Sequence, residues 1–375
     1  MKICFVAPIP LRCKGITIKN NRIGGIAVWI EQLWKYINSN SGSNIEICYI
    51  DISTSVRTME GNRFSHLLHS LIDLFYQERE LKKVIARFKP DIIHVTTSGG
   101  FGSIRDLCFM KMAIDKHIPV VYHLHFGEMK KLLDKGGVIG KIQLKALRLA
   151  QTVITIDTYT HNMLEQIEVN SVYIPNLIDE KLINGYTVER GHKTVVFSGW
   201  VVKTKGIEEL LGAWDIVSKD FNDWKLKILG YYSNEYYRYL RERFKCDNVV
   251  FEGEVSRDDV LNEVALSDIC ILPSYTEGFP NSILEAMLFE KAIIGTAVGA
   301  IPTMLDNECG IIIDKANIKL IESALRKLME DGPLRTLLGK NARKKCINEY
   351  RSAVVTEKLI DIWKEAMQYE NLSNN

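Results

Sequence analysis

Two glutamates, Glu277 and Glu285, stand eight positions apart (285 − 277 = 8) in the part of the chain with the clearest chemical pattern. The apolar run from Ile269 to Leu272 predicts a strand before them, and the pattern from about Ser282 to Phe289 predicts a short helix. The helix then starts at the carboxyl edge of a strand, where unpaired backbone N–H groups and the helix dipole favour phosphate. Hydroxyl groups of a sugar would explain carboxylates among such amides.

The turn before this helix has residues that suit a helix start. Pro280 is favourable in a first helical turn, and Asn281 or Ser282 can accept hydrogen bonds from free backbone N–H groups. A simpler interpretation makes Glu285 a first-turn acid and Glu277 a solvated loop charge. For two isolated glutamates that interpretation is the more common one, so the wider pattern has to decide.

A second candidate segment, residues 198–206, reads Ser-Gly-Trp-Val-Val-Lys-Thr-Lys-Gly and lies between an expected strand and a helix starting near Ile207. It contains two lysines, Lys203 and Lys205. The simpler interpretation of Lys205 is a solvated lysine before a helix.

A third candidate, His123 and His125, ends an expected strand of the first half. Side chains alternate along a strand, so both histidines lie on one face. This spacing could ligate a metal, but no third ligand is apparent except Glu128, and a satisfied buried histidine is the ordinary alternative.

The composition is that of an ordinary globular protein, with 46% apolar and 25% charged residues in 375. This length predicts two domains. A net charge of +2 predicts no bulk attraction to nucleic acid. Eight scattered cysteines without a Cys-x-x-Cys pair indicate reduced thiols in a cytosolic protein without structural zinc.

Membrane insertion is not expected, because strand-like sequence begins at Lys2 and no apolar run approaches the ~20 residues that span a bilayer. The segment Met129 to Leu149 is basic and amphipathic, which permits peripheral contact with anionic lipid. The alternative is a solvated face over a core-facing apolar stripe. Its basic residues are Lys130, Lys131, Lys135, Lys141, Lys145 and Arg148.

Strand and helix patterns alternate throughout, which predicts two doubly wound parallel sheets. In the first half we expect strands at Ile3 to Ala7, Ile45 to Ile50, Ile92 to Thr96, Val120 to Leu124, Val153 to Ile156 and Val172 to Ile174. The helices between them are expected near Gly25 to Ile37, Phe64 to Phe88, Ile104 to Lys116 and Val138 to Leu149. In the second half we expect strands at Thr194 to Ser198, Leu226 to Leu229, Val249 to Phe251, Ile269 to Leu272, Ile293 to Thr296 and Ile311 to Ile313. A polar linker, Asn176 to Lys193, joins the halves.

The stretch from Glu277 to Ala286, Glu-Gly-Phe-Pro-Asn-Ser-Ile-Leu-Glu-Ala, closely resembles the Glu-x7-Glu signature of a known family. This is family 4 of the retaining, nucleotide-sugar-dependent glycosyltransferases of the GT-B fold. The resemblance places Glu277 near the transferred sugar and Glu285 on the ribose of the nucleotide. It gives the sugar hydroxyls and the diphosphate to the turn residues Gly278, Phe279, Pro280, Asn281, Ser282 and Ile283.

The lysine loop resembles the family segment Gly-Arg-(x)4-Lys-Gly, so Gly199 and Lys205 match, and Lys205 is implied to neutralise the leaving diphosphate. Trp200 stands at the arginine position, and Lys203 is a candidate for the lost charge. The family also implies a sugar contact for a histidine at the strand end, for which we choose His125.

Three more segments resemble family segments. Gly24-Gly25 opens the first helix, as the family loop does that closes over donor and acceptor, and we assign Gly25 to the site. The dinucleotide fingerprint Gly-x-Gly-x-x-Gly is absent there, which argues against an NAD enzyme. Further departures are Leu177 in a Pro-Asn-Gly-Val-Asp-like segment, and Ala300 and Thr303 in a Gly-Gly-x-Pro-Glu-like one.

The resemblance, nearly continuous from Val195 to about Tyr350, implies a GT-B fold of two Rossmann-like domains facing across a cleft. We expect an acceptor-side domain, 1–176, completed by a C-terminal helix in 353–375, and a donor-side domain, 177–352.

The implied function is retaining transfer from a nucleoside diphosphate sugar to a saccharide or lipid-linked acceptor. We expect no metal, no other cofactor and no nucleic acid. Bacterial surface polysaccharide or glycolipid assembly, in the cytoplasm or at the inner membrane face, is the expected setting. Rival interpretations are a catalytically degenerate subunit supporting a partner transferase, and a nucleotide-sugar epimerase or phosphorylase. A glycosidase is disfavoured, because a helix N-terminus lowers the pKa of a carboxylic acid.

Overall fold

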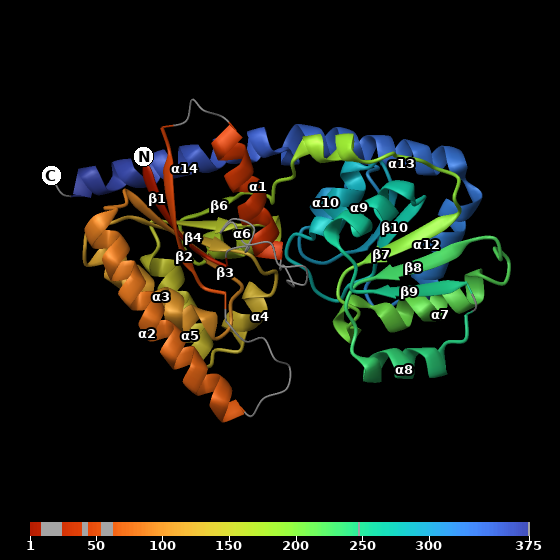
Figure 1. The fold of residues 1–375 in the computed structure, drawn as a ribbon, viewed down its shortest axis with the longest axis horizontal. Helices are drawn as coiled ribbons and strands as arrows, with labels where there is room; N and C mark the ends of the chain where they lie inside the picture. The colour runs from red at the N-terminus through yellow and green to blue at the C-terminus, as the bar shows by residue number, and fades with distance from the viewer. Residues whose placement is uncertain (9–24, 40–43, 54–62, 247, 374–375) are drawn as a thin grey trace. The chain divides into compact units, whose positions relative to one another are not determined.

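The computed structural model describes residues 1–8, 25–39, 44–53, 63–246 and 248–373. The chain forms two compact units (Figure 1). The first consists of Met1–Leu177 with Ser352–Asn375, and the second of Ile178–Arg351. Each division lies one residue from the boundary expected from the sequence.

The first unit has a six-stranded parallel sheet in the order β2-β1-β3-β4-β5-β6. Its strands are β1 (Lys2–Ala7), β2 (Glu46–Asp51), β3 (Ile92–Thr97), β4 (Val120–Leu124), β5 (Thr152–Thr155) and β6 (Ser171–Tyr173). Its helices are α1 (Gly25–Ser39), α2 (Arg63–Arg87), α3 (Gly102–Ile114), α4 (Met129–Asp134), α5 (Val138–Leu149), α6 (Thr158–Gln166) and α14 (Ser352–Ser373). Every strand expected from the apolar runs is present, and the doubly wound fold is confirmed.

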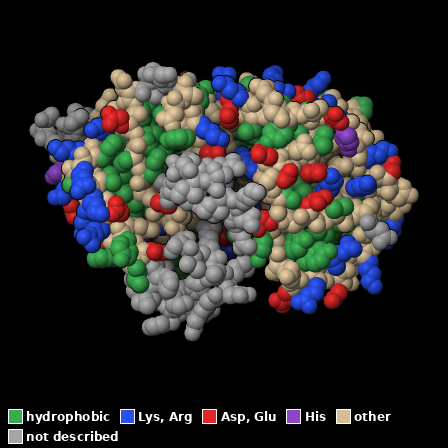
Figure 2. All heavy atoms as spheres, in the orientation of Figure 1, with side chains coloured by type: hydrophobic (Ala, Val, Ile, Leu, Met, Phe, Trp, Pro, Cys, Tyr) green, Lys and Arg blue, Asp and Glu red, His purple; other side chains and the backbone are tan. Residues whose placement is uncertain are grey.

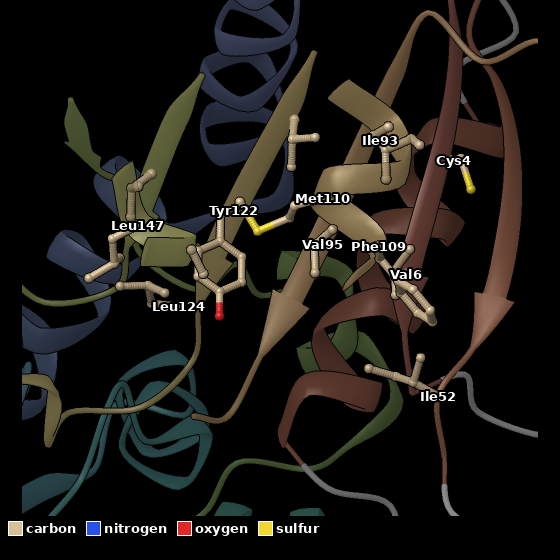
Figure 3. Close-up of a cluster of buried hydrophobic side chains, with 14 of the residues drawn as sticks. Cys4, Val6, Ile52, Ile93, Val95, Phe109, Met110, Tyr122, Leu124 and Leu147 are labelled. Carbon is tan, nitrogen blue, oxygen red and sulfur yellow. The ribbon is translucent and has the colours of Figure 1, made fainter. Parts of the chain in front are cut away.

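Central strands of this sheet are buried along their whole length because helices cover both faces. All residues of β3 and β4 are buried. On one face, Val95 and Tyr122 pack with Phe109, Met110 and Leu147 (Figure 3). These contacts join α3 and α5 to the strands.

The opposite face carries helices from both ends of the chain. Trp29 of α1 and Trp363 of α14 are buried there against Phe5 of β1. The Nε1 of Trp363 also donates to Nδ1 of His94 at 3.0 Å. The helix α14 therefore completes the core of the first unit.

The second unit repeats this architecture with a sheet in the order β12-β11-β10-β7-β8-β9. Its strands are β7 (Thr194–Ser198), β8 (Lys225–Leu229), β9 (Val249–Gly253), β10 (Ile269–Leu272), β11 (Ala292–Thr296) and β12 (Ile311–Ile313). Its α-helices are α7 (Ile207–Val217), α8 (Asn234–Arg243), α9 (Arg257–Leu266), α10 (Asn281–Leu288), α11 (Ile301–Leu305), α12 (Ile318–Glu330) and α13 (Gly332–Lys345). The 3₁₀ segments η2 (Glu180–Gly185) and η3 (Lys203–Lys205) and the π segment η4 (Cys346–Tyr350) complete it.

Acidic and basic side chains are interspersed on the drawn face of the second unit (Figure 2). No helix within the described residues is long and apolar enough to cross a bilayer.

Candidate functional site

The carboxyl edge of the second sheet brings the lysine loop against the turn after β10. Gly206 has a φ of +71°, and a Cβ added there would lie 2.1 Å from the carbonyl oxygen of Pro273. The backbone N–H of Tyr275 donates to the carbonyl of Thr204 at 2.9 Å. Only glycine permits this backbone approach, which places Lys205 beside the turn.

We expect Gly206→Ala to destabilise the second unit by about 2–4 kcal/mol, because the added methyl would overlap the Pro273 carbonyl at an unfavourable φ. The measurement is denaturant unfolding of the full chain. Gly185→Ala is the matched control, since an added Cβ there meets nothing within 4 Å. Equal stability of the two variants would show that the approach at Gly206 is not required.

Glu277 is held by two donors at one oxygen. Its Oε1 accepts from the Nζ of Lys205 at 2.5 Å and from the Oγ of Ser274 at 2.6 Å. The side chains of Lys205 and Glu277 are 26% and 10% exposed. The structure thus joins two residues that lie 72 positions apart in sequence. Ser274 is a partner that the sequence argument missed, although it belongs to the Leu-Pro-Ser before the signature.

The turn and α10 offer backbone rather than side chains. The ring of Phe279 is buried and packs edge-on against Tyr350, with centroids 5.4 Å apart. Pro280 and Ile283 are buried too, whereas Asn281 and Ser282 are partly exposed. The helix cap is Pro280, and no side chain caps it, contrary to the Asn or Ser cap expected from the sequence. The start of α10 therefore has no side-chain cap.

Glu285 lies one helical turn further and is 8% exposed. Burial raises the pKa of its carboxyl group, and the nearby Arg257 partly opposes that shift. The Nη2 of Arg257 donates to Oε1 of Glu285 at 3.1 Å. Sequence reasoning missed Arg257, although its place at the start of a helix after β9 puts it on the same sheet edge.

Trp200 and Lys203 of the lysine loop lie at the surface, whereas Val201 is buried. The side chain of Trp200 is exposed, at 43%, and Lys203 is exposed without an ion pair among the described residues. The N–H of Gly199 donates to the carbonyl of Leu229 at 2.9 Å, which ties the loop to β8. Lys205 is therefore the loop lysine that contacts a candidate carboxylate.

The segment after β11 supports the turn. Gly299 has a φ of +54°, and an added Cβ would lie 2.3 Å from the carbonyl oxygen of Glu277. The N–H of Ala300 donates to the carbonyl of Gly278 at 2.8 Å, and Ala300 is fully buried. Ala300 thus packs beneath the turn, where its small side chain fits the buried position.

The first unit holds the partly buried His125 beside two fully buried histidines, His94 and His123. His123 and His125 lie on one face of β4, as the alternation predicts, with ring centroids 4.0 Å apart. His94 of β3 joins them through an Nε2 to Nδ1 distance of 3.3 Å to His123. Burial lowers the pKa of His125 to about 3, so its imidazole is neutral near pH 7. The Nε2 of His125 is buried without a partner among the described residues.

The remaining residue assigned to the site in the first unit is Gly25. It is the first residue of α1, while Gly24 lies outside the described residues. No group of three or more potential metal ligands occurs in the part of the chain that the structure describes.

Comparison with protein families places both halves of the chain. A model described as glycosyl transferases group 1 matches residues 179–345, and one described as glycosyltransferase family 4 matches residues 43–182.

Curated relatives match parts of the chain. CapM of Staphylococcus aureus, a capsular polysaccharide biosynthesis glycosyltransferase, is 33% identical over 193 residues, which are 48% of this chain and 49% of CapM. The N,N'-diacetylbacillosaminyl-diphospho-undecaprenol alpha-1,3-N-acetylgalactosaminyltransferase of Campylobacter jejuni is 29% identical over 114 residues, 30% of each protein. These alignments span half or less of either relative.

Solved structures match along nearly the whole chain. Sucrose-phosphate synthase from Thermosynechococcus elongatus has a TM-score of 0.79 at 15% identity, covering 98% of this chain and 99% of that one. Anabaena HepE in complex with UDP-glucose has a TM-score of 0.70 at 15% identity, covering 97% and 100%. At such identities the likeness concerns the fold. With two family models covering most of its length and this shared fold, the chain belongs to the group 1 glycosyltransferases of the GT-B fold.

Proposed function

We propose that this protein transfers a sugar from a nucleoside diphosphate sugar to an acceptor hydroxyl, with retention of configuration at the anomeric carbon. The observation that carries the proposal is the contact of Lys205 with Glu277 beside the uncapped N-terminus of α10. A cation and helix amides suit a diphosphate, and a carboxylate beside them suits sugar hydroxyls.

In the proposed reaction, the bond from the anomeric carbon to the diphosphate oxygen breaks and a bond to the acceptor oxygen forms on the same face. The acceptor proton leaves with the diphosphate. Lys205 and the amides at the start of α10 stabilise the negative charge that develops on the leaving group. Glu277 orients the sugar, and Glu285 accepts hydrogen bonds from the ribose. These groups supply the electrostatic stabilisation without a metal ion.

The nucleotide donor is also supported by HepE, a fold relative whose structure contains UDP-glucose. Polysaccharide or glycolipid assembly is supported by CapM and by the Campylobacter jejuni transferase, whose name includes a saccharide on diphospho-undecaprenol. His125 and Gly25 of the first unit are proposed to contact the transferred sugar and the substrates, as the family resemblance implies.

The proposal is tested by product analysis. The full chain is incubated with UDP-, GDP- and ADP-sugars and with saccharides or polyprenyl-diphosphate saccharides, and the product linkage is determined by NMR. An α-linked donor should give an α-linked glycoside. A β-linked product would overturn the retaining mechanism, and an isomerised nucleotide sugar without transfer would favour the epimerase interpretation.

Peripheral membrane contact is proposed for the basic segment. All six of its basic side chains, Lys130, Lys131, Lys135, Lys141, Lys145 and Arg148, are exposed. Glu128 and Asp134 offset part of this charge, at 2.9 Å from Lys131 and 3.4 Å from Lys130. Each basic residue near an anionic surface contributes about 1 kcal/mol.

We therefore expect the protein to float with phosphatidylglycerol vesicles and not with phosphatidylcholine vesicles. Lys141→Glu with Lys145→Glu should remove most of the binding, because both side chains are exposed on α5. Binding that is unchanged in this double variant, or absent on anionic vesicles, would contradict membrane contact through this segment.

A further inference from the structure

Lys205 forms an ion pair with Glu277 in this structure. In the proposed function it is also the cation that binds the diphosphate of the donor. The other nearby cations are placed differently. Lys203 is exposed without an ion pair among the described residues, and Arg257 donates to Glu285 at 3.1 Å. Trp200, which brings no charge, stands where the resembled family has arginine. A diphosphate at the start of α10 would therefore compete with Glu277 for the ammonium group of Lys205.

The two partners of Glu277 differ in burial and in side-chain length. Ser274 is fully buried, follows β10 by two residues, and has its carbonyl fixed by the Oγ1 of Thr296 at 2.6 Å. Lys205 is 26% exposed on a 3₁₀ turn and has a long flexible side chain. Both donate to Oε1, which leaves Oε2 of Glu277 outside these two contacts. The lysine is the partner that can leave, and the serine is the one that stays.

We propose that donor binding exchanges Lys205 from Glu277 to the diphosphate, and that Ser274 is the positioning residue that holds Glu277 once the lysine has moved. This inference rests on the proposed function. No covalent bond changes in the exchange. A diphosphate carries more negative charge than one carboxylate and forms strong charge-assisted hydrogen bonds, so it can take the ammonium. Glu277 then keeps one fixed hydrogen bond and turns its carboxylate to the sugar.

The exchange predicts that Glu277 opposes nucleotide binding. In Glu277→Gln the side chain keeps its shape and can still accept from Ser274, but it no longer holds Lys205 by charge. We expect the nucleoside diphosphate that binds the wild type, chosen from UDP, GDP and ADP by calorimetry, to bind this variant about tenfold more tightly.

A double-variant cycle with Lys205→Gln separates exchange from simple removal of negative charge. If Lys205 is the shared partner, Glu277→Gln should change the Kd by less than twofold in the Lys205→Gln background. An equal tightening in both backgrounds, or none in either, would overturn the exchange. If no nucleoside diphosphate binds the wild type, the proposed donor class itself is wrong.

Ser274 has its own test through the same measurement. In Ser274→Ala, Lys205 is the remaining partner of Glu277 oxygen Oε1, so a nucleotide must break that last hydrogen bond. We expect nucleotide binding to weaken about three- to fivefold. Ser274 itself is buried, so this effect would act through Glu277. In the Glu277→Gln background the same substitution should change the Kd by less than twofold.

A purely structural role for Ser274 would weaken nucleotide binding equally in both backgrounds, and that result would overturn its positioning role. Thermal unfolding checks that each variant is folded. If Ser274→Ala does not fold, Ser274→Cys serves instead, because it nearly preserves the volume and provides only a weak donor.

Discussion

Replacing Lys205 with methionine is expected to lower donor turnover by about 10²–10³-fold, the usual cost of removing one group that stabilises developing charge. The reason is its place: its Nζ lies 2.5 Å from Glu277 beside the start of α10. Methionine keeps a similar length without the charge. The measurement is the rate of nucleoside diphosphate release from the identified donor in the presence of acceptor.

Lys203→Met is the matched control for this prediction. Lys203 is two residues away, is exposed and has no ion pair among the described residues, so we expect a change of less than tenfold. A larger loss in Lys203→Met than in Lys205→Met would contradict the assignment. It would show that Lys203 supplies the charge missing at Trp200.

The first unit is expected to lose stability steeply as the pH falls below 6.5. Burial lowers the pKa of His94 and of His125 from 6.5 to about 3, and it lowers the pKa of His123 well below 6.5. Between pH 6.5 and 3 the unfolded chain binds protons that the folded unit does not, so stability rises with pH in this window. Each histidine contributes about 1.4 kcal/mol per pH unit. The measurement is urea unfolding, followed by tryptophan fluorescence, at several pH values.

His94→Asn should lower the number of protons taken up on unfolding by about one, and with it the slope of stability against pH, because one buried imidazole is removed. His117→Asn, on the exposed surface of the same unit, is the control and should leave it unchanged. If His94→Asn has the same pH dependence as the wild type, the neutral cluster does not cause the acid sensitivity.

The fold follows from the sequence because periodicity reports burial. Parallel strands covered on both faces are continuous apolar runs, and β4 and β10 coincide with the runs at Val120 to Leu124 and Ile269 to Leu272. At other strands the observed ends differ from the expected ends by a residue or two, because hydrogen bonding and not hydrophobicity decides where a strand ends. The segment Met129 to Leu149 forms two helices, α4 and α5, separated at Gly136 with φ +65°.

The candidate site was predictable where its residues stand in one short sequence motif, as Glu277, Glu285 and Lys205 do. The contact between Lys205 and Glu277 was not predictable, because it spans 72 positions and depends on the close backbone approach at Gly206. Arg257 and Ser274 could not be assigned as partners because their roles arise only when separate strands meet at one sheet edge. Composition and hydrophobic periodicity do not predict which side chains from separate strands come into contact.

The most direct test of the account is nucleotide binding by the second unit within the full chain. Thermal unfolding is followed with UDP, GDP, ADP and their sugar conjugates, because a ligand that binds the folded state raises the unfolding temperature. We predict a shift with one nucleotide and its conjugates, lost in Glu285→Ala, which removes the proposed ribose acceptor next to Arg257. No shift with any nucleotide, or a shift unchanged in Glu285→Ala, would contradict the assignment of the donor site.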